Sequence, residues 1–309
     1  MLSRIAESLF WIGRYIERSD GTARILDVHL QLLLEDPWIA EDLACRSLLG
    51  VMGTAVPGEA PIGRADVLQL LAVDRTQPAS IAYSLVAARE NARRAREVVS
   101  TELWEALNTT RSRMPRRVAS EKVHEFFAWV RERSALAIGI ADSATSRDEA
   151  WHFFTLGRSL ERADMTARLL ATRSLSEVSG PSWTTILRSV GAYEAYLRTY
   201  HGVPSAQNAA EFLLLDRLFP RSILFSVARA EECMRELEPG VGRLGVSDPT
   251  LMLLGRIRSR LEYRAIGDII EDLPHQMDEV QLATSAASES IRGRYFPSEA
   301  VPSWSGRLS

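Results

Sequence analysis

The chain has 309 residues, of which 46% are hydrophobic and 25% are charged, a composition typical of folded globular proteins rather than of disordered ones. Its 37 basic and 40 acidic residues leave a formal net charge of −3, which excludes an overall positive field for nucleic acid or for an anionic membrane. The opening residues MLSRIAESLFW interrupt the apolar core that a secretory signal needs, and no stretch of about 18 uncharged apolar residues occurs, so we expect neither export nor a membrane span.

Apolar residues near the start of the chain recur at steps of three and four, which predicts a long helix that reaches about Leu34. Its apolar face consists of Leu2, Ile5, Leu9, Ile12, Ile16, Ala23 and Leu30. Strand-like alternation is nearly absent from the rest of the chain, so the sequence predicts an all-α protein. Between short breaks that carry Pro or Gly, further helices are expected over residues 39–53, 65–73, 79–111, 118–143, 146–177, 182–201, 207–217, 220–237, 248–271 and 274–295.

A charged motif is repeated within the chain. Residues 10–24 read FWIGRYIERSDGTAR, and residues 154–168, which lie 144 positions later, read FTLGRSLERADMTAR. Nine of the fifteen positions are identical, and among them are a glycine, three arginines, a glutamate and an aspartate. A second element, DRTQPASI at 74–81, returns as DRLFPRSI at 216–223, at the similar offset of 142. Two matches in the same order indicate an internal duplication.

We therefore interpret residues 1–148 and 149–296 as two copies of one helical unit, followed by a C-terminal tail at 297–309. No Gly/Ser-rich linker separates the copies. We expect them to bury their apolar faces against each other as one domain, a long-helix bundle built from two tandem pseudo-symmetric copies. The tail has no periodic apolar face and is expected to be loose or extended.

The charges of the repeated motif allow three interpretations. They could form a solvated helix face, but exposed ion pairs contribute only about 0.2–0.5 kcal/mol, and copies that diverged elsewhere would not be expected to keep them. They could form buried ion pairs that fix how the copies dock. They could instead line a polar cleft at the pseudo-twofold axis between the two copies, where guanidinium groups hold a carboxylate or phosphate and a glutamate binds an amine. The last two interpretations stay open.

The DRxxPxSI element predicts a turn that enters a helix, with Pro78 and Pro220 in the first helical turn. An alternative is an anion site, since free N–H groups at a helix start would lie beside Arg217 and Arg221. The first copy has Ala79 where the second has Arg221, so any such site would be asymmetric.

Other chemistry-bearing patterns are weak. The Glu-x-x-His spacing of EKVH at 121–124 and EAWH at 149–152 occurs in di-iron helical bundles, but the two matches fall at non-equivalent places in the copies. No nucleotide-binding or hydrolase motif is present, and we expect no metal and no cofactor. Cys45 and Cys233 lack CxxC spacing, which predicts reduced, buried thiols and a cytoplasmic protein.

The chain resembles the bacterial alpha-E domain family, an all-helical group, over essentially its whole length. The resemblance is carried by SRIAESLFWIGRYIERSDGTAR, ARENARRAREVVSTELWEALN, LGRSLERADMTAR and EFLLLDRLFPRSI. It implies a cytosolic partner of a circularly permuted ATP-grasp protein, often encoded with a transglutaminase-like peptidase, in a peptide-synthesis or peptide-modification system. The polar residues that it singles out are Arg4, Glu7, Arg14, Glu17, Arg18, Arg24, Glu90, Asn91, Arg158, Glu161, Arg162, Arg168, Asp216 and Arg221.

Three hypotheses follow for function. The first is a non-catalytic helical module that binds a peptide, an amino-acid-like ligand or the ATP-grasp partner through the Arg/Glu centre. The second is an enzyme that forms or cleaves an amide bond with Glu17 or Glu161 as acid/base, which requires burial to raise the pKa of that glutamate. The third is a purely structural role for the cluster.

Overall fold

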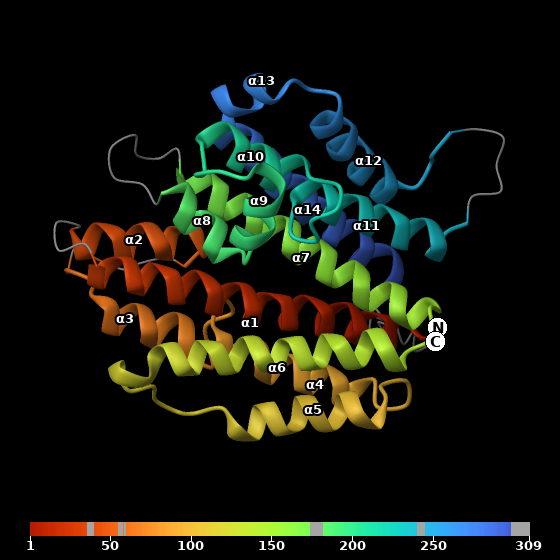
Figure 1. Ribbon diagram of the computed structural model, residues 1–309. Helices are drawn as coiled ribbons and strands as arrows, with labels where there is room; N and C mark the ends of the chain where they lie inside the picture. The colour runs from red at the N-terminus through yellow and green to blue at the C-terminus, as the bar shows by residue number, and fades with distance from the viewer. Residues whose placement is uncertain (36–39, 55–57, 59, 174–181, 240–244, 298–309) are drawn as a thin grey trace, which may run out of the picture.

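The computed structural model describes residues 1–35, 40–54, 58, 60–173, 182–239 and 245–297, and within these ranges the chain is helical with no strand (Figure 1). The all-α prediction is therefore confirmed. The helices are α1 (Ser3–Glu35), α2 (Glu41–Val51), α3 (Arg64–Leu68), the π-helical η1 (Gln69–Val73), α4 (Ile81–Arg94), α5 (Thr101–Arg113), the 3₁₀-helical η2 (Ser120–Lys122), α6 (Val123–Ala144), α7 (Glu149–Arg173), α8 (Trp183–Ser189), α9 (Tyr193–Tyr200), α10 (Ala206–Leu215), α11 (Ile223–Leu237), α12 (Pro249–Glu262), α13 (Ile266–Glu271) and α14 (Leu273–Tyr295).

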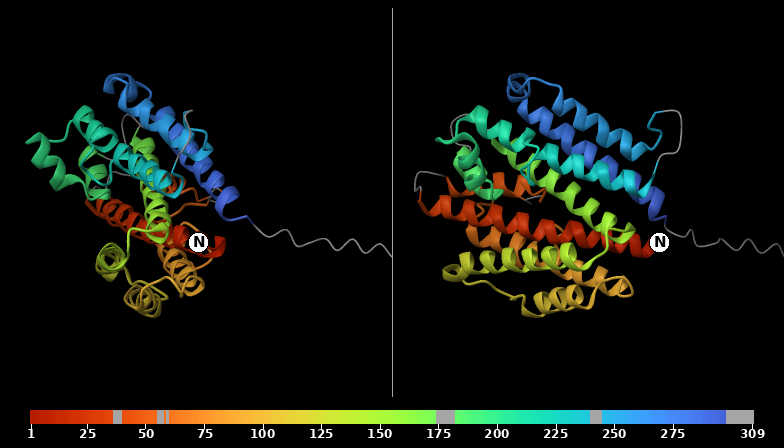
Figure 2. Two further views of the ribbon diagram at one scale, coloured as in Figure 1. Left: turned by 90° about the vertical axis from the view of Figure 1, so that its right-hand side faces the viewer. Right: turned by 45° about the vertical axis from the view of Figure 1, so that its right-hand side comes forward.

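Two long helices, α1 and α7, pack on each other at the centre of the molecule (Figure 1). On one side α4 and α6 pack against α1, and α5 covers them; on the other side α11 and α14 pack against α7, and α12 covers them. The short helices cross between the groups, because α2 contacts α7 while α8 contacts α1. The views in Figure 2 show the same two groups of helices on either side of the central pair.

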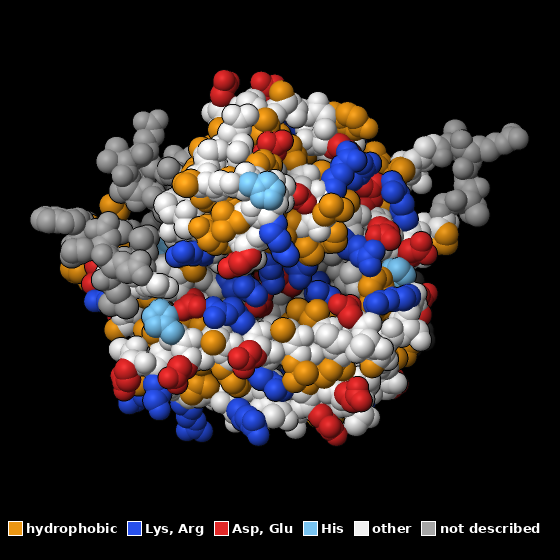
Figure 3. Space-filling model, in the orientation of Figure 1, with side chains coloured by type: hydrophobic (Ala, Val, Ile, Leu, Met, Phe, Trp, Pro, Cys, Tyr) orange, Lys and Arg blue, Asp and Glu red, His pale blue; other side chains and the backbone are white. Residues whose placement is uncertain are grey.

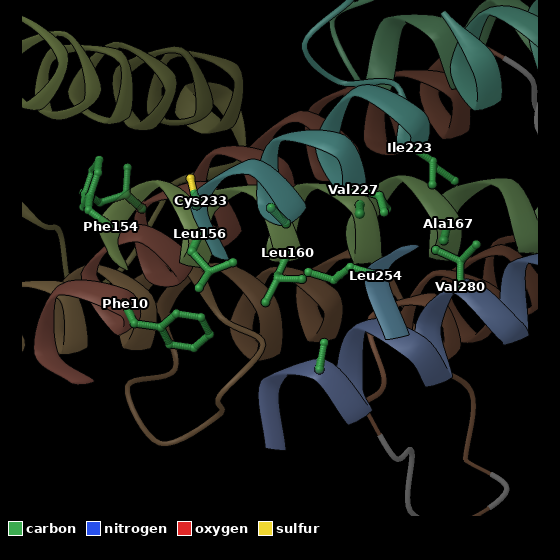
Figure 4. Packing of buried hydrophobic residues seen from close by; sticks show 14 of the residues in the cluster. Phe10, Phe154, Leu156, Leu160, Ala167, Ile223, Val227, Cys233, Leu254 and Val280 are labelled. Carbon is green, nitrogen blue, oxygen red and sulfur yellow. The ribbon is translucent and has the colours of Figure 1, made fainter. Parts of the chain in front are cut away.

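The main hydrophobic core follows the contact between α1 and α7. Phe10 of α1 is 1% exposed, and Leu160 of α7 is fully buried. Figure 4 shows side chains from α11, α12 and α14, such as Val227, Leu254 and Val280, converging on α7. A second buried cluster lies under α2, α3, η1 and α6. Both halves of the sequence therefore contribute to a shared interior.

Helix α1 forms as the apolar periodicity predicts, with one exception at its start. Ile5, Leu9, Ile12 and Ile16 are all buried. Leu2 precedes the helix and is 61% exposed, so its assignment to the buried face was wrong. A residue ahead of the first turn need not follow the helical period.

Several expected helices are shorter than the sequence pattern suggested. The window 79–111 divides into α4 and α5, and Ser100 caps α5 by accepting a hydrogen bond from the N–H of Leu103 at 3.2 Å. The window 182–201 divides at Gly191, whose φ is +66°, a conformation that favours glycine. The window 248–271 divides into α12 and α13. Residues 174–177 of the expected helix 146–177, and residues 298–309 of the tail, lie outside the described residues.

The prolines of the repeated turn do not lie in the first helical turn, so that prediction was wrong. Helix α4 begins at Ile81, two positions later than expected, and α11 begins at Ile223, three positions later than expected. The hydroxyl of Ser80 accepts from the N–H of Tyr83 at 2.9 Å, and the hydroxyl of Ser222 accepts in the same way from the third residue beyond it at 3.1 Å. Serine side chains therefore cap both helices, and the prolines belong to the preceding turns.

Candidate functional site

Two glycines determine how closely α1 and α7 approach. A Cβ at Gly13 would lie 2.1 Å from the carbonyl oxygen of Phe154, and a Cβ at Gly157 would lie 2.1 Å from the carbonyl oxygen of Phe10. Because no Cβ fits at such a distance, only glycine allows the two backbones to touch here. The crossing brings the charged residues that follow each glycine against the opposite helix.

Glu161 on α7 is held by two arginines of α1. Arg18 donates from Nε to Oε1 at 2.5 Å and from Nη2 to Oε2 at 2.9 Å, while Arg14 donates from Nε to Oε2 at 2.7 Å. The Glu161 side chain is 1% exposed, so these donors replace water around both oxygens. Arg14 is held in turn by α14, because its Nη1 donates to Oγ of Ser288 at 2.6 Å.

Glu17 on α1 is held by arginines from the other half of the chain. Arg162 of α7 donates from Nε to Oε1 at 2.8 Å and from Nη2 to Oε2 at 2.7 Å. Arg221, in the turn before α11, donates from Nη1 to Oε1 at 2.6 Å. The Glu17 side chain is also 1% exposed. Each glutamate thus joins α1 to α7 through paired guanidinium groups.

Both glutamates are held in their charged form. Burial alone would raise the pKa of Glu161, but the charges and hydrogen bonds of Arg18 and Arg14 outweigh it and lower that pKa to about 2. Burial likewise opposes ionisation of Glu17, and Arg162 and Arg221 bring the pKa of that carboxyl well below its usual range. A carboxylate in this state is a poor proton donor near neutral pH.

An aspartate one turn beyond each glutamate extends the cluster. Asp20 accepts from Arg24 Nε at 3.0 Å and from Arg221 Nη2 at 2.5 Å. Asp164 accepts from Arg168 Nε at 2.7 Å, and burial raises the pKa of this carboxyl above its ordinary value. The two aspartates therefore differ in how many guanidinium groups they contact.

Each outer arginine reaches towards a glycine turn of the other half. A Cβ at Gly191 would lie 2.6 Å from Nη1 of Arg24. A Cβ at Gly53, whose φ is +65°, would lie 3.5 Å from Nη1 of Arg168. The turns after α8 and α2 therefore pass close to the ends of the cluster.

Arg158 is less well paired than the other arginines of the motif. Its Nε lies 4.0 Å from Oε2 of Glu17 and makes no hydrogen bond to the described residues, and its Nη1 lies 3.5 Å from Oδ2 of Asp142. Burial and the neighbouring Arg162 lower the pKa of Arg158. Arg221 donates to Oε1 of Glu17. At the corresponding glutamate of the second copy, Glu161, the guanidinium donors among the described residues are Arg14 and Arg18, both from α1.

Two pockets adjoin the cluster. The first is lined by Glu17, Arg24, Arg162 and Arg221 together with Ser189 of α8, and its volume of about 20 Å³ is enough for about one water molecule. The second has a volume of about 280 Å³, and its lining residues are Arg18, Met52, Gly53, Gln77, Pro78, Ala79, Glu161, Asp164, Met165 and Arg168. Figure 3 shows basic and acidic side chains gathered in the middle of one face of the molecule.

The structure brings together nine of the residues singled out in the sequence. They are Arg14, Glu17, Arg18, Arg24, Arg158, Glu161, Arg162, Arg168 and Arg221. The remaining six lie outside the cluster. Glu7 is half-buried on α1, and Asn91 donates to the carbonyl of Ala87 at 2.8 Å.

The other four lie in ion pairs or turns. Arg4 pairs with Glu97 at 2.8 Å, and Glu90 pairs with its neighbours Arg89 and Arg93. Asp216 accepts from the N–H groups of the turn before α11, and Arg217 pairs with Glu262. The alternative of an anion site formed by Arg217 and Arg221 gains no support, because these two arginines contact different acidic residues.

Two residues of the cluster were missed from the sequence. Asp142 of α6 contacts Arg158, and Ser288 of α14 contacts Arg14. Neither lies in the repeated motif. An internal alignment of α6 with α14 at an offset of 146 places LAIGIAD beside LATSAAS, and these two residues then fall at the same position. That alignment is the signal that could have found them.

Neither the two cysteines nor a group of metal-binding side chains adds a further site within the described ranges. Cys45 and Cys233 are free and buried, as expected, and burial raises the pKa of Cys45 to about 11 and that of Cys233 to about 12. Within the same ranges no group of three or more His, Cys, Asp or Glu side chains is placed to hold a metal ion. None of the helices there is long and apolar enough to cross a membrane.

Comparison with known proteins finds a helical family and mycobacterial relatives. A family profile described as "a predicted alpha-helical domain with a conserved ER motif" matches residues 1–296. Glu-Arg pairs occur at 17–18 and 161–162, inside the cluster, and at 132–133, outside the repeated motif. The chain is 26% identical over 278 residues to uncharacterized proteins of Mycobacterium bovis and Mycobacterium tuberculosis. The matched region covers 81% of this chain and 31% of those relatives, and no solved structure matches.

Proposed function

The chain belongs to the Alpha-E family, and from this premise we propose that it is a non-catalytic helical module that binds a peptide or an amino-acid-like ligand beside its Arg/Glu cluster. One observation carries the proposal. A charged pocket of about 280 Å³ opens beside a cluster whose own glutamates are already neutralised by arginines. A pocket of a few hundred Å³ with a small number of polar groups is typical of small-ligand sites.

We propose further that residues 1–148 and 149–296 are two copies of one unit, which pack as a single domain. The contacts of the repeated residues support this interpretation. Arg18 of α1 contacts Glu161 of α7, and Arg162 of α7 contacts Glu17 of α1 in the same bidentate way. In this arrangement the cluster stabilises the docking of the copies, and the larger pocket beside it is free to bind a ligand.

Partnership with a circularly permuted ATP-grasp protein, in the cytoplasm, completes the proposal. The chain spans about a third of the length of the curated relatives it matches. In those relatives the helical region is therefore joined to other sequence, and covalent linkage raises the effective concentration of two modules that work together. We expect the ATP-grasp protein, with or without a transglutaminase-like peptidase, to be such a working partner in peptide synthesis or modification.

The enzyme hypothesis gains no support from the cluster. A general acid with a glutamate side chain needs a raised pKa and access to substrate. Glu17 and Glu161 are each 1% exposed, and the pKa of each is lowered. Their oxygens are already occupied by guanidinium donors.

Co-purification tests the partnership. The tagged chain is co-expressed with a circularly permuted ATP-grasp protein from the same genome, as wild type, as Arg168→Ala and as Arg46→Ala. Arg168 lines the larger pocket, whereas Arg46 pairs with Asp42 away from both pockets. The two arginines are a matched pair, because each bonds an aspartate four residues earlier and they are 30% and 28% exposed.

We expect the wild type and Arg46→Ala to retain the partner and Arg168→Ala to lose most of it, with all three chains showing cooperative thermal unfolding. Equal retention by all three would place the contact away from the cluster and refute this part of the proposal. Failure of the wild type to retain the ATP-grasp protein would refute the partnership itself.

A further inference from the structure

Arg221 shows how this cluster holds a guanidinium group. Its Nη1 donates to Oε1 of Glu17 at 2.6 Å, and its Nη2 donates to Oδ2 of Asp20 at 2.5 Å. Glutamate and aspartate three residues apart lie on the same helical face, so one planar guanidinium can bridge both carboxylates. The Arg221 side chain is 18% exposed and fills its site from the turn before α11.

The same pair of carboxylates recurs on α7 as Glu161 and Asp164. The turn that faces them is the first copy of the repeated element, where Ala79 stands at the position of Arg221. The two turns approach the long helices in a similar way, because Arg18 donates to the carbonyl of Pro78 at 3.5 Å and Arg162 donates to that of Pro220 at 3.2 Å. A methyl group therefore stands where the other turn presents a cation.

The shorter side chain of Ala79 leaves open space between this turn and α7. The pocket beside Ala79 has a volume of about 280 Å³, against about 20 Å³ for the pocket beside Arg221. Both Glu161 and Asp164 line the larger pocket, and Arg18 and Arg168 line it as well. The space thus lies over Glu161 and Asp164, which correspond to the two carboxylates that the Arg221 guanidinium bridges in the other half.

The hydrogen bonds at this pocket leave acceptor capacity for one more donor. Oε1 of Glu17 accepts from both Arg162 and Arg221, whereas Oε1 of Glu161 accepts from Arg18. A carboxylate oxygen can accept two hydrogen bonds. Asp164 lies deep in the protein and accepts a hydrogen bond from Arg168. Burial raises the pKa of its carboxyl, although the charges of Arg168 and, less strongly, Arg14 oppose that rise. An added cation would favour the charged form of Asp164.

We propose that the pocket beside Ala79 binds a guanidinium-bearing ligand, whose cation bridges Glu161 and Asp164 as Arg221 bridges Glu17 and Asp20. The inference rests on the proposed function as a binding module and specifies its ligand as arginine, either free or within a peptide. Because Arg18 and Arg168 also line the pocket, an anion is the alternative ligand that the experiment must distinguish from a guanidinium.

Calorimetric titration of the purified 309-residue chain tests this inference. The probes are ethylguanidinium, L-arginine and acetyl-Gly-Arg-Gly-amide, with ethylammonium and acetate for comparison. We expect one guanidinium per chain, and at least about tenfold weaker binding of ethylammonium, which cannot span two carboxylates with a planar fork. Binding of the peptide but not of free arginine would identify a peptide as the source of the cation, and the reverse would identify the amino acid.

Three variants locate the site. Asp164→Asn is expected to weaken guanidinium binding by about tenfold or more, because a charge-assisted hydrogen bond is lost. Ala79→Arg is expected to abolish binding and to raise the melting temperature, since it supplies the cation from the turn itself. Ala79→Leu fills space without charge and is expected to reduce binding with no such rise in melting temperature.

Arg221→Ala is the internal positive control. It opens the corresponding site beside Glu17, and we expect a lowered melting temperature that ethylguanidinium partly restores. If the wild type binds no guanidinium, the inference is overturned, whether or not the probe restores Arg221→Ala. Preferential binding of acetate to the wild type would overturn it too. The titration uses the chain alone, so partner capture without guanidinium binding refutes only this inference, and the reverse refutes only the partnership.

Discussion

At the scale of single residues, the centre of the molecule consists of reciprocal ion pairs between the charged side chains of α1 and α7. Glu161 receives guanidinium groups from α1, and Glu17 receives them from α7 and from the turn before α11. A buried ion pair is costly to assemble, because each charge must leave water, and removing one partner costs about 3–5 kcal/mol since it strands the other. Such a network favours one arrangement of the helices over others in which the same charges would be unpaired.

The lowered pKa of Glu161 makes stability depend on pH in a defined window. The unfolded carboxyl titrates near pH 4.3, whereas the folded one titrates at about 2. As pH falls between these values the unfolded state takes up the proton first, so the contribution of this group to stability is lost. We expect Glu161→Gln to lower the free energy of unfolding by about 3–5 kcal/mol at pH 7, and by progressively less as pH falls from about 5 to about 2.

Urea denaturation across this pH range measures the difference between the two proteins. Glu289→Gln is the control, because Glu289 is 68% exposed and pairs only loosely with Arg292 at 3.4 Å. Its stability is expected to run parallel to that of the wild type. A constant gap between wild type and Glu161→Gln across the whole range would contradict the assigned ionisation of Glu161.

At the scale of elements, the crossing of α1 and α7 positions everything else. Gly13 and Gly157 are each placed against a backbone carbonyl of the opposite helix. Glu17 and Glu161 lie about one turn beyond the glycines, so the lengths of their ion pairs depend on this closest approach. The interhelical distance and the charge network are therefore parts of one arrangement.

Gly157→Ala is expected to destabilise the protein by about 3 kcal/mol or more, because the new Cβ would meet the carbonyl oxygen of Phe10 and the helices would have to separate. Gly139 on α6 provides the matched control. It is an exposed helical glycine where an added Cβ would meet no atom within 4 Å, so Gly139→Ala is expected to stabilise by about 0.5–1 kcal/mol. Equilibrium unfolding of both variants measures the contrast, and similar effects of the two substitutions would argue against a tight crossing.

At the scale of the whole molecule, neither half holds a complete set of partners for its own charges. Glu17 lies in residues 1–148, while Arg162 and Arg221 lie in residues 149–296. The short helices also cross over, since α2 contacts α7 and α8 contacts α1. Separated halves would expose both the apolar faces and the charges of the central helices.

We therefore expect residues 1–148 and 149–309, expressed as two chains, to associate as a one-to-one complex and to lack cooperative unfolding when kept apart. Glu17→Gln in the first chain should weaken the complex by more than about a hundredfold, in line with the cost of stranding buried arginines. Size-exclusion chromatography and thermal melts of each chain and of the mixture make the measurement. Independent folding of either half at the melting temperature of the intact chain would count against a shared core.

The sequence could predict the helices and the residues of the cluster, because apolar period and repeated charges are local signals. It could not separate α4 from α5, since apolar residues continue at helical spacing across the break and Ser100 is a weak signal by itself. It left buried ion pairs and a polar cleft equally open, because the burial of Glu17 depends on helices distant in sequence. The sequence did not predict the contacts of Asp142 and Ser288 for the same reason, because each contacts its arginine only when α6 and α14 have packed against the central helices.

The two ends of the described chain meet at one pole of the molecule. The Met1 amino group pairs with Glu149 at the start of α7, and the ring of Phe296 packs against Phe10 and Phe153. In a longer relative, sequence attached before or after this helical region would therefore leave from the same place. A neighbouring domain would therefore be attached at the same end of the molecule, whether it precedes or follows this helical region in the chain.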